Sequence, residues 1–248
     1  QMELLRRVAA VNKNVITVLF NGRPLDLREV SEYSKAIVEA WMPGTEGGHG
    51  IMDVLTGAYN PTGKLPMSFP YSVGQLPMSY NHYSCGRPKP AEGRGDYTSR
   101  YLDAPNEPLY PFGYGLSYTK FTYSNLTLSD DTVFVTVKNT GSIAGAEVVQ
   151  LYVEAPQNSL HRPVRELKGF QKLFLQPNES REAVFRLTDR SFAVWQDGWK
   201  IPVGQYTVSI GGLTAPVIKH GETLPVPAWQ RGSWYQSCTG KPNKKDWE

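Results

Sequence analysis

The pattern of hydrophobic and polar positions in residues 1–57 predicts alternating short helices and strands. Apolar residues recur at helical spacing in 4–11, and 15–20 is a continuous, β-branched run typical of a strand buried on both faces. The expected elements are a helix at 4–11, a strand at 15–20, a helix at 28–35, a strand at 36–41 and a helix at 51–57, which Gly57 would end. This part of the chain is therefore expected to be α/β.

The first predicted helix begins almost at residue 1, with no capping residue or lead-in before it. Residue 1 is Gln, and no signal peptide precedes the helix. We therefore expect the sequence to start partway through a domain and to be a C-terminal fragment of a longer protein.

Residues 58–125 have few periodic stretches and are repeatedly interrupted by Pro, Gly and Tyr. A loop of this length inside a compact fold is unusual, and it commonly serves a function or connects two domains. We expect this segment to wrap across a surface.

From about residue 126 the pattern changes to period 2, which predicts β-strands separated by turn residues. The expected strands are 133–138, 148–153, 167–175, 180–187, 193–195 and 205–210. Short strands at this spacing favour an antiparallel β-sandwich of the immunoglobulin or fibronectin type III kind. Because no Cys-Trp-Cys core is present, the fibronectin version is favoured.

Residues 213–248 lack periodicity but contain Trp229, Trp234 and Trp247. A tail so rich in aromatic residues would be poorly soluble if it were free, so we expect it to dock on another domain. The predicted organisation is an α/β part at 1–85, a linker at 86–125, a β-sandwich at 126–212 and an aromatic-rich tail at 213–248.

Composition and charge exclude several classes of protein. The 248 residues are 40% hydrophobic and 20% charged with a net charge of +3, which disfavours a disordered chain or a nucleic-acid-binding protein. No apolar run reaches the roughly 18–20 residues of a membrane span. Cys85 and Cys238 are expected to be unrelated thiols, and the four histidines show no metal-binding spacing, so neither a metal nor a cofactor is predicted.

Two glycine-rich stretches lack the features of nucleotide-binding loops. The segment 57–64 has a Pro between its glycines and Leu65 where a phosphate loop needs Ser or Thr. The glycines of 44–50 are too irregularly spaced for a dinucleotide motif, so they are expected to let the backbone turn or approach another domain. Glu46 in this loop is expected to accept backbone N–H bonds at the start of the following helix.

Five ordered motifs, followed by a sixth, carry a resemblance to a known family. They are NGRPL at 21–25, AWMPGTEGG at 40–48, DVLTGAYNPTGKLPMSFP at 53–70, YTSRY at 97–101, LYPFGYGLSYT at 109–119 and RPVRELKGF at 162–170. Together they closely resemble the C-terminal half of glycoside hydrolase family 3, of the bacterial β-glucosidase type. The resemblance covers about residues 1–212 and implies the end of the family's α/β sandwich domain, a wrapping linker and a fibronectin type III-like domain.

The resemblance also implies where the chemistry of the parent enzyme lies. In that family a (β/α)8 barrel supplies an Asp nucleophile, and a loop upstream of the strand at 15–20 supplies a Glu acid/base. Both positions would precede residue 1, so no catalytic residue is expected in this chain. The implied parent is a retaining glycoside hydrolase that removes terminal β-linked glucosyl or related glycosyl residues, and its missing N-terminal barrel would be the principal partner.

Five residues are candidates to border the sugar site, because aromatic rings stack on sugars and polar groups bond to hydroxyls. They are Tyr97, Arg100, Tyr101, Glu46 and His49. The competing explanation is that these residues belong to a linker packed between domains. The sugar, the linkage, the oligomeric state and the compartment, cytoplasmic or exported, stay open.

A second hypothesis is a non-catalytic module in which the β-sandwich binds a carbohydrate or a protein. Its mark would be an exposed aromatic strip on one sheet face. Phe192, Trp195 and Tyr152 lie in strand-like runs, where burial in the core is the simpler expectation. This expectation disfavours the binding module.

Overall fold

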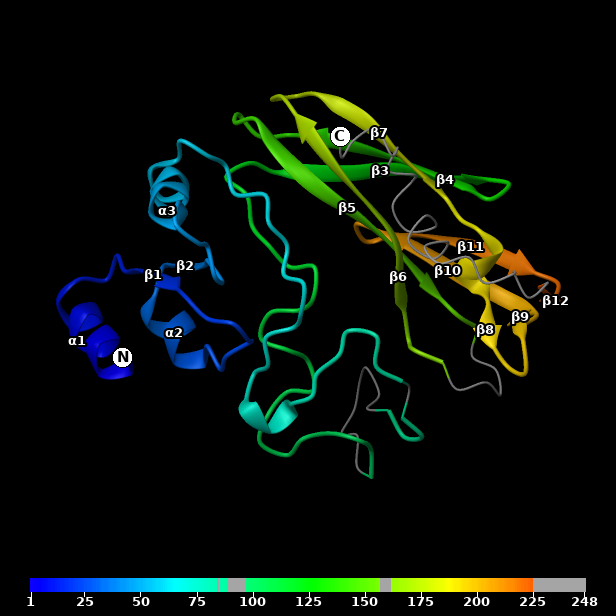
Figure 1. The fold of residues 1–248 in the computed structure, drawn as a ribbon, viewed down its shortest axis with the longest axis horizontal. Helices are drawn as coiled ribbons and strands as arrows, with labels where there is room; N and C mark the ends of the chain where they lie inside the picture. Colours follow the sequence, from blue (N-terminus) through cyan, green and yellow to red (C-terminus); the bar gives the residue numbers. More distant parts are fainter. Residues whose placement is uncertain (84, 89–96, 157–161, 225–248) are drawn as a thin grey trace. The chain divides into compact units, whose positions relative to one another are not determined.

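The structure is a computed structural model and describes residues 1–83, 85–88, 97–156 and 162–224. The chain divides into two compact units, a first unit of residues 1–116 and a second unit of residues 117–248. Figure 1 shows most of the helices near the start of the first unit and the long strands in the second unit. Each unit is described by itself.

The first unit begins with the predicted alternation of helices and strands. Its elements are α1 (Met2–Val11), β1 (Ile16–Leu19), α2 (Arg28–Tyr33), β2 (Ala36–Glu39), α3 (Gly47–Thr56) and the 3-10 helix η1 (Val73–Gln75). The strands β1 and β2 pair in parallel, from Ile16 opposite Ala36 to Leu19 opposite Glu39. The α/β prediction for this part is therefore confirmed.

Helix α3 starts earlier than the apolar pattern suggested, at Gly47. A Cβ atom at Gly47 would lie 2.6 Å from Cγ of Pro43, so the missing side chain lets the chain turn closely into the helix. The helix ends as predicted at Gly57, which has a left-handed φ of 80° and donates its N–H to the carbonyl of Val54.

The long segment after α3 partly pairs with itself. Leu65 N–H donates to the Tyr114 carbonyl, and Phe69 and Tyr110 form an antiparallel bridge. Phe69 is buried and packs with Leu27 and Val30 in the core of the first unit. The predicted loop thus completes this small core.

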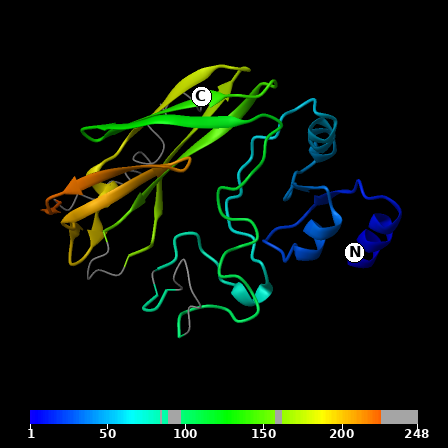
Figure 2. The same cartoon turned by 180° about the vertical axis from the view of Figure 1, so that it is seen from behind.

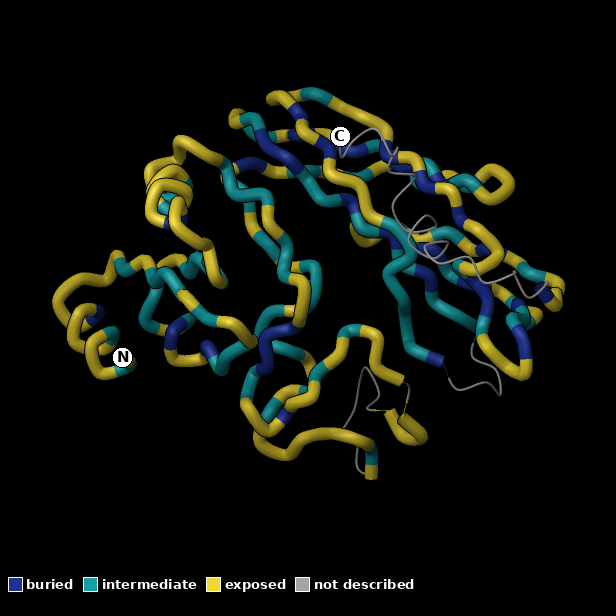
Figure 3. The backbone as a smooth tube through the Cα atoms, in the orientation of Figure 1, coloured by how far each residue is buried: buried dark blue, intermediate teal, exposed yellow. Residues whose placement is uncertain are grey.

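Much apolar surface of the first unit stays exposed. Leu4, Val8 and Val11 lie on the predicted apolar side of α1, yet all three are exposed. Ile16, the first residue of β1, and Phe20, which directly follows this strand, are exposed as well. In Figure 3 buried positions are sparse in this unit and frequent along the long strands of the second.

The second unit is the β-sandwich that the period-2 pattern predicts. Its elements are β3 (Phe121–Ser129), β4 (Thr132–Asn139), β5 (Gly145–Glu154), β6 (Glu166–Leu175), β7 (Ser180–Arg186), α4 (Asp189–Phe192), β8 (Val194–Trp195), β9 (Trp199–Ile201), β10 (Gly204–Ile210), β11 (Leu213–Lys219) and β12 (Glu222–Thr223). The sheets have the orders β3-β4-β7, β11-β10-β5-β6 and β12-β9-β8. Figure 2 shows the strands from behind.

Two strands and the first part of a third lie where the sequence predicted linker or tail. Strand β3 begins at Phe121, inside the predicted linker 86–125, and β11 and β12 lie inside the predicted tail 213–248. Pro216 obscured β11 in the sequence, because proline cannot donate to a central ladder. It is tolerated here because β11 is the edge strand of its sheet.

The core of the second unit lies between its two larger sheets. Val133, Val135 and Val137 of β4 have no exposed surface, as their alternation predicts. The prediction of burial holds for Phe192 in α4, whereas Tyr152 is half-buried.

The prediction of burial is wrong for Trp195, which is 58% exposed. Strand β8 is a two-residue edge strand, and Trp195 pairs across its hairpin with Trp199 in an edge-to-face contact. Phe192 and Ala193, which precede it, take the buried positions, so Trp195 extends beyond the core.

The predictions for Trp229, Trp234, Trp247 and Cys238 fall on residues 225–248, which lie outside the described residues. Within the described ranges, no helix combines the length and the apolar character that a membrane crossing requires.

Candidate functional site

Glu46 and His49, two of the five predicted site residues, lie at the start of α3. The Glu46 side chain forms no capping hydrogen bond, contrary to expectation. Its backbone has ψ near 6° rather than the extended geometry of a helix-capping residue, and its Oε2 lies 2.8 Å from Nδ1 of His49 instead. Both side chains are largely exposed to solvent.

Tyr97, Arg100 and Tyr101 lie on an exposed loop that Asn106 holds closed. The Tyr101 N–H donates to Oδ1 of Asn106, and Nδ2 of Asn106 donates to the Ser99 carbonyl. Tyr97 is 90% exposed and has a left-handed φ of 59°. The loop therefore presents aromatic and cationic groups to the outside.

The structure does not gather the five predicted residues into one cluster. In Figures 1 and 2, α3 and the segment that begins at residue 97 lie at opposite ends of the first unit. Any site that they share therefore needs further groups between them.

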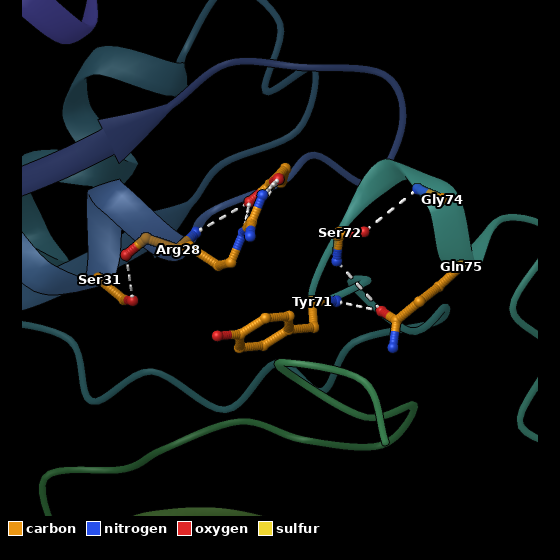
Figure 4. Close-up of polar contacts among 7 residues, drawn as sticks. Arg28, Ser31, Tyr71, Ser72, Gly74 and Gln75 are labelled. Atoms are coloured by element: carbon orange, nitrogen blue, oxygen red, sulfur yellow. Dashed lines mark hydrogen bonds and ion pairs between the residues drawn. The ribbon is translucent and has the colours of Figure 1, made fainter. Parts of the chain in front are cut away.

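Gln75 anchors the long segment that leads to the candidate tyrosines. Its Oε1 accepts the N–H groups of Tyr71 and Ser72 (Figure 4). Its Nε2 donates to the carbonyls of Pro105 and Glu107. The side chain is buried, so these bonds are shielded from water. Gln75 thereby joins the two ends of the stretch that holds the exposed loop.

Arg28 connects helix α2 to the same region. Its Nη2 lies 2.6 Å from Oδ2 of Asp26, and its guanidinium lies 5.1 Å from the centre of the Tyr71 ring (Figure 4). The hydrogen bond from Arg28 holds the pKa of the Asp26 carboxyl below its usual value, although burial opposes this. These contacts join α2 to the segment that contains Tyr71.

A second polar site, which the sequence analysis did not identify, lies at the carboxyl ends of β1 and β2. In open α/β folds this edge is where ligands bind. Nδ2 of Asn21 donates 2.7 Å to the Arg23 carbonyl, and the Trp41 N–H donates 3.0 Å to Oε1 of Glu39. Trp41 has a left-handed φ of 51° and packs on Phe69.

Two oxygen atoms at this edge, Oδ1 of Asn21 and Oε2 of Glu39, are buried without a hydrogen-bond partner. Burial raises the pKa of the Glu39 carboxyl, while the Trp41 N–H and the Asn21 side chain lower it. Two features of the sequence indicate this site. Glu39 is the only charged residue in the apolar run 36–41, and Asn21 directly follows the first strand.

Glu39 is not one of two paired catalytic carboxylates. Retaining glycoside hydrolysis needs two carboxyl groups about 5–5.5 Å apart. The groups that shift the pKa of Glu39 are the Asn21 side chain and the Trp41 N–H, with no second carboxylate among them. In the described part of the chain, no cluster of His, Cys, Asp or Glu could hold a metal ion.

Comparison with known proteins identifies the class to which both units belong. Residues 1–118 match the model of the glycosyl hydrolase family 3 C-terminal domain, and residues 147–214 match the fibronectin type III-like domain. The first unit is therefore a family 3 C-terminal domain, and the second unit contains a fibronectin type III-like domain. The chain belongs to glycoside hydrolase family 3.

Two relatives show what share of a longer protein the chain matches. A periplasmic beta-glucosidase from Salmonella typhimurium is 46% identical over 227 residues, which cover 88% of this chain and 30% of the relative. A thermostable beta-glucosidase B from Acetivibrio thermocellus is 37% identical over 231 residues, again 88% of this chain and 30% of the relative.

Solved structures give the same result. A beta-glucosidase from Listeria innocua in complex with glucose has a TM-score of 0.84 and 41% identity, over 90% of this chain and 33% of that one. A family 3 beta-glucosidase from Bifidobacterium adolescentis has a TM-score of 0.74 and 32% identity, over 96% and 38%. The chain thus spans about a third of the length of the proteins it matches.

Proposed function

We propose that this chain is the C-terminal part of a retaining β-glucosidase that removes terminal β-linked glucosyl or related glycosyl residues. The observation that carries the proposal is the 46% identity to a periplasmic beta-glucosidase over 88% of the chain. The catalytic carboxylates lie upstream in this proposal, and the chain supports the site rather than performing the chemistry.

The exposed apolar surface of the first unit is consistent with a chain that packs against an upstream part of the enzyme. Parallel sheets are stable when both faces are covered and when several strands pair. Here the sheet has two strands, and Ile16, Phe20 and the apolar side of α1 stay exposed. In the proposal, the upstream part of the enzyme covers these surfaces and extends the sheet.

Tyr97, Arg100 and Tyr101 are our proposed substrate-bordering residues, with Glu46 and His49 as further candidates. The loop at 97–101 exposes two phenol rings and a guanidinium, which suit stacking on a sugar and hydrogen bonding to hydroxyls. Buried Gln75 fixes the backbone that leads to this loop, which reduces the ordering that substrate binding would require.

The alternative function is a non-catalytic carbohydrate- or protein-binding sandwich, which would need an exposed aromatic strip. Phe170 and Phe174 of β6 and Trp195 of β8 are each more than half exposed. However, β6 and β8 belong to different sheets, so these residues do not form one strip on one face. Binding of soluble β-glucans by the chain alone, lost in F170A/F174A, would favour this alternative.

Hydrolysis of an aryl β-glucoside tests the proposed function. The purified chain should be inactive, because loss of both the nucleophile and the acid/base removes most of the rate enhancement. Addition of the upstream part of the full-length enzyme should restore turnover. Turnover by the chain alone, after a control for contaminating enzyme, would overturn the placement of both carboxylates upstream.

The reconstituted enzyme also tests the proposed substrate-bordering loop. Tyr97→Ala and Arg100→Ala should raise KM with a smaller effect on kcat, because neither residue supplies a reacting group. Tyr59→Ala, which removes another exposed tyrosine, is the matched control. Equal effects of all three substitutions would argue that the loop does not contact the substrate.

A further inference from the structure

Strand β6 carries two phenylalanine side chains on the outer face of its sheet. Phe170 is 59% exposed and Phe174 is 55% exposed, whereas Leu173 and Leu175 on the same strand are buried in the core. Because successive side chains of a strand point to opposite faces, Phe170 and Phe174 both point away from the core. The core of the second unit therefore does not account for these two rings.

The neighbouring strand β5 extends this apolar surface. Residues that lie directly opposite each other in an antiparallel pair share a face of the sheet. The register of β5 and β6 thereby adds three half-buried residues to the two phenylalanines. Together they form what we call the β5–β6 face, which consists of Val148, Tyr152, Leu167, Phe170 and Phe174. Contiguous exposed apolar residues of this kind mark a surface for interaction.

The polar groups of the β5–β6 face do not suit a sugar. A sugar site combines an aromatic ring with polar groups that bond to hydroxyls, and phenylalanine has no polar group. Tyr152 donates its hydroxyl to Oε1 of Gln150, and the Arg165 guanidinium lies 5.1 Å from the centre of the Tyr152 ring. The two exposed phenylalanines instead suit an apolar protein surface.

Edge pairing with a second copy of the chain is also disfavoured. Strand β6 is at the edge of its sheet, and Lys172 is exposed between the two phenylalanines. A lysine on an edge strand opposes pairing with another edge. In addition, the pairing of β5 and β6 has an irregularity between Leu151 and Tyr152, and such irregularities bend an edge strand.

We propose that the β5–β6 face is a docking surface for an apolar part of the upstream region of the parent enzyme, with Phe170 and Phe174 as the central contacts. The inference rests on the proposed function and extends it, because the second unit as well as the first then contacts the upstream region. The chain covers 30% of the Salmonella typhimurium relative, so in a parent of that length most of the polypeptide is available to cover the face. Buried aromatic side chains at the centre of an interface commonly supply much of its binding energy.

Thermal melting of the full-length enzyme tests the docking without reconstitution. The double substitution F170A/F174A should lower its melting temperature, because two rings lose their apolar contacts with the upstream region. In the 248-residue chain alone, the same substitutions should leave the melting of the second unit unchanged, since both rings are exposed there. Val184→Ala is the matched control, because it shortens an exposed apolar side chain on β7, in the facing sheet.

The control should leave the melting temperature of the full-length enzyme unchanged. The proposal is overturned if F170A/F174A also leaves it unchanged, or if Val184→Ala lowers it equally. An equal decrease in the full-length enzyme and in the chain alone would overturn it too, because the two phenylalanines would then stabilise the second unit itself.

Binding of the 248-residue chain to the separate upstream part, measured by isothermal titration calorimetry, separates this inference from the proposed function. F170A/F174A should weaken the binding at least about tenfold. If both forms bind equally and restore turnover of an aryl β-glucoside equally, the docking is refuted and the proposed function stands. If the unsubstituted chain neither binds nor restores turnover, the proposed function fails and the docking fails with it.

Two further measurements on the chain alone test the other occupants. Analytical ultracentrifugation detects a dimer, and affinity electrophoresis in soluble β-glucan detects sugar binding. Neither is expected from the β5–β6 face. A dimer or a glucan complex that disappears in F170A/F174A would assign the face to a second copy or to a sugar, and either result would overturn the proposal.

Discussion

The Thr119 hydroxyl donates a 2.6 Å hydrogen bond to Oδ1 of Asn139, a side chain with no exposed surface at the end of β4. The same oxygen accepts the Gly141 N–H, and Nδ2 of Asn139 donates to the carbonyls of Ile143 and Leu175. One amide thus connects the start of the second unit, the turn after β4 and the end of β6. Buried networks of this kind stabilise a fold when every member is satisfied.

Substitution of Asn139 by Ala should destabilise the second unit strongly. It removes the partner of the Thr119 hydroxyl, of the Gly141 N–H and of two carbonyls. Each orphaned buried group costs about 1–3 kcal/mol, so we expect a loss of roughly 3 kcal/mol or more. Urea unfolding monitored by circular dichroism measures the loss. Gln176→Ala, at an exposed amide in a turn, is the control, and an equal loss in both variants would contradict this role of Asn139.

Gly211 and Gly212 form the turn between β10 and β11, with φ of 57° and 87°. A Cβ atom at Gly211 would lie 2.4 Å from the Tyr123 ring, whereas one at Gly212 would meet nothing within 4 Å. Both Ala substitutions cost roughly 1–2 kcal/mol of backbone strain. Gly211→Ala should cost about 1–3 kcal/mol more because it overpacks the site.

Thermal unfolding of the two glycine variants separates these contributions, since the backbone strain is common to both. Equal melting temperatures would show that Tyr123 moves aside freely. Tyr123 is held by a 2.8 Å bond from its hydroxyl to Oε1 of Glu147 in the facing sheet, which opposes such a movement.

Arg162 is buried and donates to the Phe192 carbonyl at 2.9 Å and to Oε2 of Glu166 at 3.2 Å. Arg162→Met should destabilise by roughly 2–3 kcal/mol, below the 3–5 kcal/mol typical of a broken buried pair, because Glu166 keeps its bond from Lys168. Arg181→Met removes an exposed pair with Glu179 and should cost less than about 1 kcal/mol. Chemical denaturation of both variants tests this order, and an equal loss would contradict it.

Residues 117–224 should fold alone, because their core cluster lies entirely between β3 and Leu224. Residues 126–212, the range predicted from the sequence, should not fold stably. They lack the start of β3 and all of β11, including the buried Val217. Proton NMR dispersion and thermal melting measure the folding of the two fragments, and a cooperative transition for 126–212 would refute the prediction.

Residues 1–85 should lack a cooperative transition of their own. In this range the core loses its contacts with Leu109 and Tyr110, and apolar residues of α1 and β1 are exposed. A sharp melting transition for 1–85, with dispersed amide signals, would show that the two-stranded sheet is sufficient.

Local sequence patterns determined much of the fold. The apolar run at 15–20 and the helical spacing at 4–11 identified β1 and α1, because burial on both faces of a strand and on one side of a helix leaves different periods in the sequence. The alternation of Val133, Val135 and Val137 identified β4 and its buried side in the same way. The family motifs extended this to the order of the two units and to the family of the chain.

Tertiary structure decided what local patterns do not encode. Trp195 is exposed because an edge hairpin extends beyond the core, and β11 exists despite Pro216 because it pairs on one side only. Asn21 and Glu39 meet only because β1 and β2 pair in parallel and bring their carboxyl ends to one edge. The period of a strand tells which of its residues lie on the same face of the sheet. The residues that they contact on other strands depend on register and sheet order, which are set by contacts between segments far apart in the chain.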